Sequence, residues 1–226
     1  MPTPTKQFDN MTTVKPSPTF KGEDGLKRCF WCASDPIYVD YHDNEWGRPV
    51  TDDTKLYEKL CLEGFQAGLS WITILRKREA FRAAFKDFDP VKVARFNDKN
   101  IERLMNNEGI VRNRAQIEAT IGNAKATLRV QQEVGSLSKL IWSFAPIKPG
   151  KAPKTFGDLP ASTPESHALS KELLKRGFKF VGPTTMYAAM QSLGLVKDHV
   201  ANCHARHTAY VIAFTQSRLQ HILTAQ

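Results

Sequence analysis

Helix-start signals recur along most of the chain, and this pattern constrains the fold more than any other feature of the sequence. The signals are Asp52 or Asp53, Ser70, Asp89–Pro90, Asn97 or Asp98, Ser136, Ser166 and Gly182–Pro183. Short polar side chains cap the first turn of a helix, and proline is favoured at its first position. Because apolar residues follow these signals at helical spacing, we predict an all-α fold of seven to nine helices.

The longest predicted helix contains Ile117, Ile121, Ala124 and Leu128, whose spacing of four, three and four puts them on one face. A last helical stretch is expected over residues 199–203. Strand signals are few, and the best is the run 37–39, Ile-Tyr-Val. Five prolines and two glycines in residues 145–165 predict a long connection there.

The ends of the chain lie outside the helical pattern. Residues 1–27 are rich in Pro, Thr and Lys and are expected to form a disordered tail. The folded domain is expected over residues 28–205, with 206–226 as a C-terminal extension. The sequence contains neither a secretory signal nor a run of 18 apolar residues. We therefore expect a cytoplasmic protein without a membrane span, and a monomer by default.

Cysteine usage also points to a reducing compartment. The chain has four cysteines, Cys29, Cys32, Cys61 and Cys203, which is sparse for a disulfide scaffold. Free thiols, or thiolates bound to a metal, are therefore expected.

Four of the Cys and His residues have spacing that suits a metal. His199 and Cys203 stand at i and i+4, so a helix there would present both from one face. With Cys29 and His42 they would make a closed tetrahedral Cys2His2 set, typical of structural zinc. Unrelated buried cysteines and a stray histidine fit the spacing equally well.

Other nearby residues keep the ligand set open. Cys29 and Cys32 form a C-x-x-C pair that, with His42, is a possible metal variant, and His204 and His207 are further candidates. A catalytic zinc is not expected, because the sequence has no H-E-x-x-H motif or deaminase signature.

One carboxylate is predicted to face inward. Leu56, Leu60 and Glu63 are spaced by four and three, so Glu63 shares a helix face with apolar residues. A buried carboxylate needs hydrogen-bond donors, a cation or a proton. Backbone groups or an arginine would satisfy it in an ordinary core. In a functional site it would accept hydrogen bonds from a ligand, such as the exocyclic amine of a purine.

Aromatic residues crowd the same part of the chain, namely Trp31, Tyr38, Tyr41, Trp46 and Trp71. Core packing explains most aromatic residues. Here several of the rings stand among polar residues, which suggests the lining of a cleft. Flat rings suit a pocket for an extruded nucleobase, since every base offers a π face.

Two segments have features of DNA-binding elements. Gly68 and Leu69 form a turn whose leucine could act as an apolar wedge in a base stack, although a plain helix-breaking turn is the simpler interpretation. Gly109, Arg112 and Arg114 stand between two predicted helices, as in a helix–hairpin–helix element that grips a DNA backbone. Val111 replaces the second hairpin glycine, so an ordinary αα-turn fits as well. The formal net charge of +9 favours a polyanionic partner.

Seven runs together resemble the type I 3-methyladenine DNA glycosylases. They are Arg28–Cys29, Tyr41–Gly47, Cys61–Gly64, Gln66–Ile72, Asp89–Val93, Lys175–Gly182 and Gly194–His199. The resemblance covers residues 28–205. It implies a helix–hairpin–helix glycosylase fold with a zinc-binding module that joins the N- and C-terminal segments.

The resemblance also implies roles for individual residues. One structural zinc would be held by Cys29, His42, His199 and Cys203. Base recognition falls to Glu63 and Tyr41, pocket walls and stacking to Trp31, Trp46 and Trp71, with Tyr38 beside them, and the DNA-probing loop to Gly68 and Leu69. Cys32 is an extra thiol whose role the resemblance leaves open.

The implied function is base-excision repair, by hydrolysis of the N-glycosidic bond of 3-methyladenine in alkylated double-stranded DNA. No lysine nucleophile is required, so a monofunctional enzyme without a lyase step is expected. Two other classes share these features. A non-catalytic binder of damaged or single-stranded DNA would use the same charge, rings and hairpin, and a zinc hydrolase is a third option.

Overall fold

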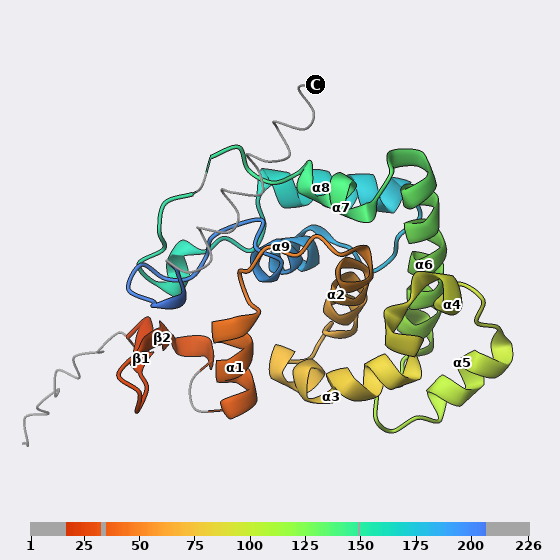
Figure 1. Cartoon of the computed structure of the whole chain (residues 1–226), viewed down its shortest axis with the longest axis horizontal. Helices are drawn as coiled ribbons and strands as arrows, with labels where there is room; N and C mark the ends of the chain where they lie inside the picture. The colour runs from red at the N-terminus through yellow and green to blue at the C-terminus, as the bar shows by residue number, and fades with distance from the viewer. Residues whose placement is uncertain (1–16, 33–34, 149, 207–226) are drawn as a thin grey trace, which may run out of the picture.

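The computed structural model describes residues 17–32, 35–148 and 150–206, and these are mostly helical (Figure 1). In chain order its elements are β1 (Thr19–Lys21), β2 (Lys27–Cys29), η1 (Phe30–Cys32), α1 (Pro36–Asn44), α2 (Asp53–Phe65), α3 (Trp71–Ala84), η2 (Lys86–Phe88), α4 (Pro90–Val93), α5 (Asp98–Met105), α6 (Arg114–Val134), α7 (Leu137–Trp142), η3 (Phe156–Asp158), α8 (Pro164–Lys175) and α9 (Pro183–Ser192). The predicted all-α class and the number of helices are confirmed for this part of the chain.

Helix α2 lies at the centre of the fold, with α3, α6, α7 and α9 packed around it (Figure 1). Asp52 caps its first turn by accepting a hydrogen bond from the amide of Lys55 at 2.9 Å. Asp53 ties the same end to α7, because its carboxylate accepts from the amides of Leu137 and Ser138. Every α2 residue from Leu60 to Phe65 is buried, so Glu63 faces inward as the spacing predicts.

The segment expected as a disordered tail contains an antiparallel hairpin. Strands β1 and β2 pair Thr19 with Cys29 and Lys21 with Lys27. The prediction of a tail was therefore wrong for residues 17–27, because backbone pairing can order a segment poor in apolar residues. Residues 1–16 lie outside the described part, as do residues 207–226 of the predicted C-terminal extension.

The run 37–39, which carries the best strand signal of the sequence, is helical. Asp35 caps α1 by accepting from the amide of Ile37 at 3.0 Å, and Pro36 occupies the first helical position. These local start signals outweigh the β-propensity of an Ile-Tyr-Val run. The start of α8 also differs from the prediction, since Thr163 caps it and Ser166 is its third residue.

The two ends of the described chain meet at one side of the molecule. Figure 1 shows the segment after α9, in blue, beside the β1–β2 hairpin and α1. The amide of His204 donates to the carbonyl oxygen of Lys27 at 2.8 Å, which joins this segment to β2. Within the described ranges, no helix is both long and apolar enough to cross a bilayer.

Candidate functional site

Four buried side chains from the two ends of the chain converge on one point. Cys29, His42, His199 and Cys203 are each at most 1% exposed. Nδ1 of His199 lies 3.7 Å from Sγ of Cys29 and 3.5 Å from Sγ of Cys203, and Nε2 of His42 lies 3.3 Å from Sγ of Cys203. In a tetrahedral zinc site, bond lengths of about 2.0–2.3 Å put neighbouring ligand atoms about 3.3–3.8 Å apart. The four residues therefore fit a metal ion.

Hydrogen bonds orient both imidazoles toward that point. Nδ1 of His42 donates to Oδ1 of Asp43 at 2.7 Å, which makes Nε2 the unprotonated nitrogen that could bind a metal; without an ion, Nε2 accepts from the amide of Cys29 at 3.3 Å. Nε2 of His199 donates to the carbonyl oxygen of Trp46 at 3.0 Å, which leaves Nδ1 free. Partners of this kind fix the tautomer and the ring orientation of metal-binding histidines.

Asp43 contacts several side chains beside the metal group, which comprises Cys29, His42, His199 and Cys203. Burial alone would raise the pKa of this carboxyl, but hydrogen bonds from Arg28, His42 and His204 lower it well below its usual range. Arg28 Nε donates to Asp43 Oδ2 at 2.9 Å, and His204 Nε2 lies 2.9 Å from Oδ1. Asp43 therefore links His204 to His42 of the Cys2His2 set. His207 lies outside the described residues.

The local conformation differs from the one the spacing suggests. Residues 199–203 form a turn and not a helix, and Cys203 still reaches the other three ligands. The amide of Cys203 donates to the carbonyl oxygen of Val200 at 2.9 Å, which closes this turn. Cys32 stands apart from the set, since its thiol donates to the carbonyl oxygen of Cys29 at 3.1 Å.

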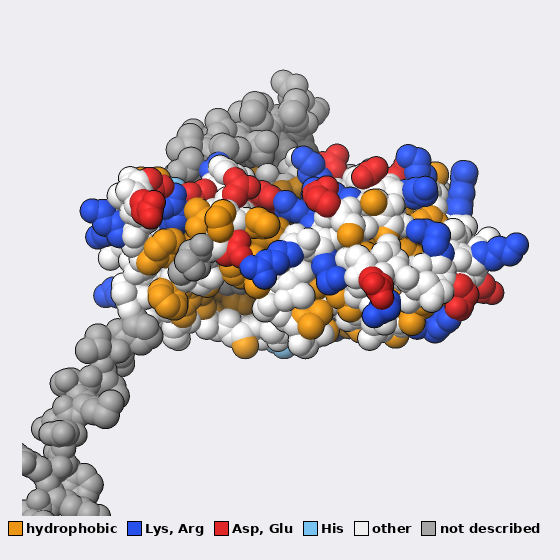
Figure 2. Space-filling view, turned by 90° about the horizontal axis from the view of Figure 1, so that it is seen from below, with side chains coloured by type: hydrophobic (Ala, Val, Ile, Leu, Met, Phe, Trp, Pro, Cys, Tyr) orange, Lys and Arg blue, Asp and Glu red, His pale blue; other side chains and the backbone are white. Residues whose placement is uncertain are grey.

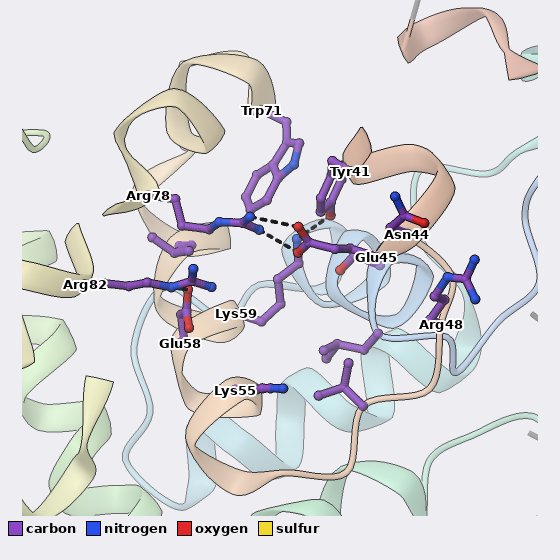
Figure 3. A pocket seen from close by; sticks show the side chains of 14 residues that line it. Tyr41, Asn44, Glu45, Arg48, Lys55, Glu58, Lys59, Trp71, Arg78 and Arg82 are labelled. Carbon is purple, nitrogen blue, oxygen red and sulfur yellow. Dashed lines mark hydrogen bonds and ion pairs between the residues drawn. The ribbon is translucent and has the colours of Figure 1, made fainter. Parts of the chain in front are cut away.

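A second cluster surrounds Glu63, whose side chain is 5% exposed. Lys59, one turn earlier on α2, places Nζ 3.0 Å from Oε1 of Glu63 and donates to the hydroxyl of Tyr41 at 2.7 Å. The same ammonium stands 3.5 Å from the ring centroid of Trp71. Glu63, Tyr41 and Trp71 thus meet around one cation, as Figure 3 shows for Tyr41, Trp71 and Lys59.

Burial changes the ionisation of both Lys59 and Tyr41. Desolvation lowers the pKa of the Lys59 ammonium, and the nearby charge of Glu63 opposes that shift. Desolvation raises the pKa of the Tyr41 phenol well above its ordinary value, and the charge of Glu63 adds to it. Tyr41 is therefore a neutral phenol, and Nε1 of Trp71 is a buried donor without a partner among the described residues.

A cavity of about 350 Å³ opens next to this cluster (Figure 3). Tyr41, Lys59 and Trp71 line its inner side. Farther out, Arg78 makes a bidentate pair with Glu45, at 2.6 and 2.8 Å, and Arg82 pairs with Glu58 at 2.8 Å. Glu63 is not among the described residues that line the cavity, and it contacts the lining through its ion pair with Lys59.

Three of the rings predicted for the pocket do not line this cavity, and their role in base binding stays a prediction. Trp31, Tyr38 and Trp46 do not belong to the described lining of the cavity. Trp31 instead packs 4.9 Å from Tyr38 and 5.2 Å from His42, and Trp46 packs 4.5 Å from His199, all between ring centroids. In this structure the three rings form a wall between the metal group and Tyr41.

The predicted probing loop projects from the junction of α2 and α3. Gly68 has a φ of +78°, which explains the glycine, and an added Cβ would meet nothing within 4 Å. Leu69 is 41% exposed, although large apolar side chains are usually covered. A wedge role for Leu69 fits this exposure and stays a prediction.

Gly109 and Arg112 lie in the α5–α6 connection, Asn113 caps α6, and Arg114 is the first residue of that helix. The Gly109 amide already donates to Oδ1 of Asn107 at 2.9 Å. Arg112 lies 3.7 Å from Glu108, and Arg114 pairs with Glu102. Figure 2 shows Lys and Arg side chains dispersed among acidic ones on the face seen from below. The DNA-binding role of this connection also stays a prediction.

Sequence reasoning missed Lys59, Glu45 and Arg78. The i, i+4 spacing of Lys59 and Glu63 was a signal, because such pairs meet on a helix surface. Glu45 and Arg78 come from different parts of the chain, the end of α1 and the middle of α3, and no local pattern links them.

Comparison with known proteins gives one consistent result. The model of the methyladenine glycosylase family matches residues 31–207. DNA-3-methyladenine glycosylase 1 of Escherichia coli (strain K12) is 52% identical over 179 residues, which cover 79% of this chain and 96% of the relative. DNA-3-methyladenine glycosylase of Haemophilus influenzae is 51% identical over 178 residues, 78% of this chain and 96% of the relative.

Solved structures agree with the sequence relatives. A crystal structure of 3-methyladenine DNA glycosylase I has a TM-score of 0.76 and 50% identity, and the match covers 78% of this chain and 98% of that one. A tyrosine-to-phenylalanine variant of 3-methyladenine DNA glycosylase I in complex with 3-methyladenine has a TM-score of 0.76 and 38% identity, over 79% and 97% of the two chains.

Proposed function

The chain belongs to the methyladenine glycosylase family and is a DNA-3-methyladenine glycosylase of base-excision repair, and we propose that Glu63, Tyr41 and Trp71 bind the alkylated base during the reaction. The observation that carries this assignment is the convergence of a buried carboxylate, a neutral phenol and an indole face on one point. Each faces the Lys59 ammonium at 3.0 Å (Glu63), 2.7 Å (Tyr41) and 3.5 Å (Trp71). A site that holds one buried cation by charge and by a π face suits a cationic base.

The chemistry of the leaving group explains why such a site is sufficient. Methylation at N3 gives the base a positive charge while it is attached to the sugar. When the bond between C1′ and N9 breaks, its electron pair goes to the base, which departs neutral. Water then forms the new bond to C1′ and releases a proton. Glu63 acts here by recognition and electrostatics, and not as a nucleophile.

The nucleotide must leave the duplex before it reaches this site. Extrusion of a base costs unstacking energy, and this cost is lower for damaged or mispaired bases. We propose that Leu69 fills the gap in the base stack, with Gly68 shaping its turn, and that Trp71 receives the extruded base. Gly109, Arg112 and Arg114 would hold the backbone of double-stranded DNA, with Trp31, Tyr38 and Trp46 supporting the pocket from behind.

We further propose zinc as the metal of the Cys2His2 group, with one ion per chain. Two thiolates and two imidazoles at tetrahedral spacing are the donor set that zinc prefers. With four protein ligands the ion has no open position, so its contribution is structural: it joins the segment around Cys29 to the segment around Cys203.

Three further features of the enzyme concern its reaction type, its compartment and its oligomeric state. A monofunctional enzyme needs no amine nucleophile, because a cationic base leaves without one. The free, buried state of all four cysteines suits a reducing cytoplasm. We propose that the enzyme acts there as a monomer.

The test is release of 3-methyladenine from methylated duplex DNA, followed by chromatography of the freed base. We expect release by the unaltered protein and a loss of at least about thirtyfold in kcat/KM for Glu63→Gln, since losing a hydrogen bond to a charged group costs about 2–3 kcal/mol. The control is Glu79→Gln, a surface carboxylate of α3 that pairs with Arg82.

Two results would contradict the proposal. No base release by the unaltered protein at low salt would refute the activity. Full activity of Glu63→Gln would refute the role given to this carboxylate. Abasic DNA that stays unbroken until alkali is added supports the monofunctional assignment, and strand breaks without alkali refute it.

A further inference from the structure

Lys59 lies where the proposed base site needs an empty space. Its ammonium contacts the carboxylate of Glu63, the hydroxyl of Tyr41 and the face of Trp71, the three groups assigned to the base. One indole face cannot hold an ammonium 3.5 Å from its centroid and a stacked base at the same time. The side chain of Lys59 is only 11% exposed, so it is a buried component of the site.

Lys59 belongs to the part of the cluster that lines the cavity. Lys59, Tyr41 and Trp71 line the cavity, whereas Glu63 is not among its described lining residues. A ligand that enters from the cavity and binds this carboxylate oxygen takes the place of the Lys59 ammonium, which lies 3.0 Å from Oε1 of Glu63. The cavity of about 350 Å³ offers space for the displaced lysine side chain.

Burial and nearby charges act on the Lys59 ammonium in opposite directions, and burial has the larger effect. Glu63 and the more distant Glu45 favour the ammonium, whereas burial and Arg78 oppose it. Arg78 and Glu45 are paired with each other at 2.6 Å, which leaves Glu63 as the direct counter-ion. An ammonium and a cationic base repel each other beside a single carboxylate, so the two compete for Glu63.

We propose that Lys59 is an internal occupant of the base site, which a cationic alkylated base displaces and which returns to Glu63 after the base has become neutral. This inference rests on the base-binding role proposed for Glu63, Tyr41 and Trp71. A cationic substrate replaces one positive charge by another beside Glu63. The neutral product leaves Glu63 without a counter-ion, and Lys59 regains its ion pair. Lys59 is thus a specificity-determining residue that favours substrate over product.

The unaltered protein provides the first test. The ε-methylene group of Lys59 is bonded to the nitrogen that stands 3.5 Å over the Trp71 ring centroid, so we expect the ring current to shift its proton NMR signal upfield. We expect one upfield lysine signal in protein labelled with ¹³C-lysine, and its identity follows from its loss in Lys59→Met. Saturating 3,9-dimethyladeninium, which keeps the positive charge of the base in the substrate, should move this signal to the ordinary lysine position. If the signal stays upfield while the Trp71 indole signal responds to this cation, the proposal is overturned.

The second test measures affinity for the free base. We expect Lys59→Met to bind 3-methyladenine at least about tenfold more tightly than the unaltered protein does, because no internal cation competes for Glu63. The matched control is Lys125→Met, which removes the same charge from an exposed position on α6 and should leave the affinity unchanged. Equal or weaker binding by Lys59→Met would overturn the proposal.

Failure of this inference can be told apart from failure of the proposed function. Base release from methylated DNA by the unaltered protein tests the function alone. Normal base release together with unchanged binding by Lys59→Met refutes the displacement of Lys59 and leaves the glycosylase assignment intact. If Glu63→Gln releases the base as fast as the unaltered protein does, the base site itself is refuted, and with it the role of Lys59.

Discussion

Sγ of Cys29 lies 3.7 Å from Nδ1 of His199, although 170 positions separate the two residues in the sequence. This contact closes nearly the whole described chain into one loop, with the base site inside it. The wall of Trp31, Tyr38 and Trp46 connects the two regions, since Trp46 contacts His199 and Trp31 lies 6.4 Å from Tyr41 between centroids. The metal group thus supports the face of the pocket that carries Tyr41.

Removal of the metal should lower Tm by roughly 10 °C or more. In the chain-entropy model, a crosslink that closes a loop of about 100 residues or more stabilises a protein by about 4–5 kcal/mol, and about 1 kcal/mol shifts Tm by about 2–4 °C at this size. The measurement is metal content by mass spectrometry, with thermal unfolding before and after chelation. Cys203→Ser should lose the metal and Cys32→Ser should keep it. Normal metal content in Cys203→Ser would contradict the assigned ligand set.

Leu69→Ala should reduce kcat/KM on methylated duplex DNA by about tenfold, with Tm unchanged. The side chain is 41% exposed and contributes little to the core, whereas loss of a wedge contact of about 1.4 kcal/mol lowers the rate tenfold. The loss of kcat/KM in Leu69→Ala should be smaller when the methylated base has no pairing partner. Leu174→Ala, on the exposed side of α8, is the control. An equal defect on paired and unpaired substrates would argue against a wedge.

The helices were predictable because their signals are local. The Asp52 cap, the Asp89–Pro90 start and the apolar stripe of α6 each act within a few residues. The strand signal at 37–39 is overridden for the same reason, because the Asp35 cap and Pro36 are stronger local signals than β-propensity.

The site was only partly predictable, because its geometry depends on contacts distant in sequence. Burial of Glu63 followed from helix spacing, and its ion pair with Lys59 lies within one helical turn. The turn at residues 199–203 and the packing of Trp46 against His199 depend on contacts between segments distant in sequence. Spacing left the Cys2His2 set undecided, and the tertiary contacts between the two chain ends bring its four residues together.

Glu63→Gln should lower the pKa of Lys59 further. Burial lowers this pKa in the native protein, and the charge of Glu63 opposes the shift. Without that charge, the effect of burial lowers the pKa of Lys59 further. The ammonium should therefore lose its proton at a lower pH in the variant. The measurement is a pH titration of the ¹³Cε signal of Lys59, with Glu79→Gln as the control. An unchanged or raised pKa of Lys59 would show that Glu63 is not its counter-ion.

Gly194→Ala should destabilise the fold by about 2–4 kcal/mol, whereas Gly122→Ala should stabilise it by about 0.5–1 kcal/mol. Gly194 has a φ of +78°, and an added Cβ would lie 2.6 Å from the backbone carbon of Arg48, an atom that cannot move aside as a flexible side chain does. Gly122 lies within α6, and an added Cβ there meets nothing within 4 Å. Because Gly194 packs on the segment after α1, its substitution should also weaken base release, as Tyr41 lies on that helix. Urea unfolding of both variants measures the two changes, and equal stability of the two would contradict the close approach at Gly194.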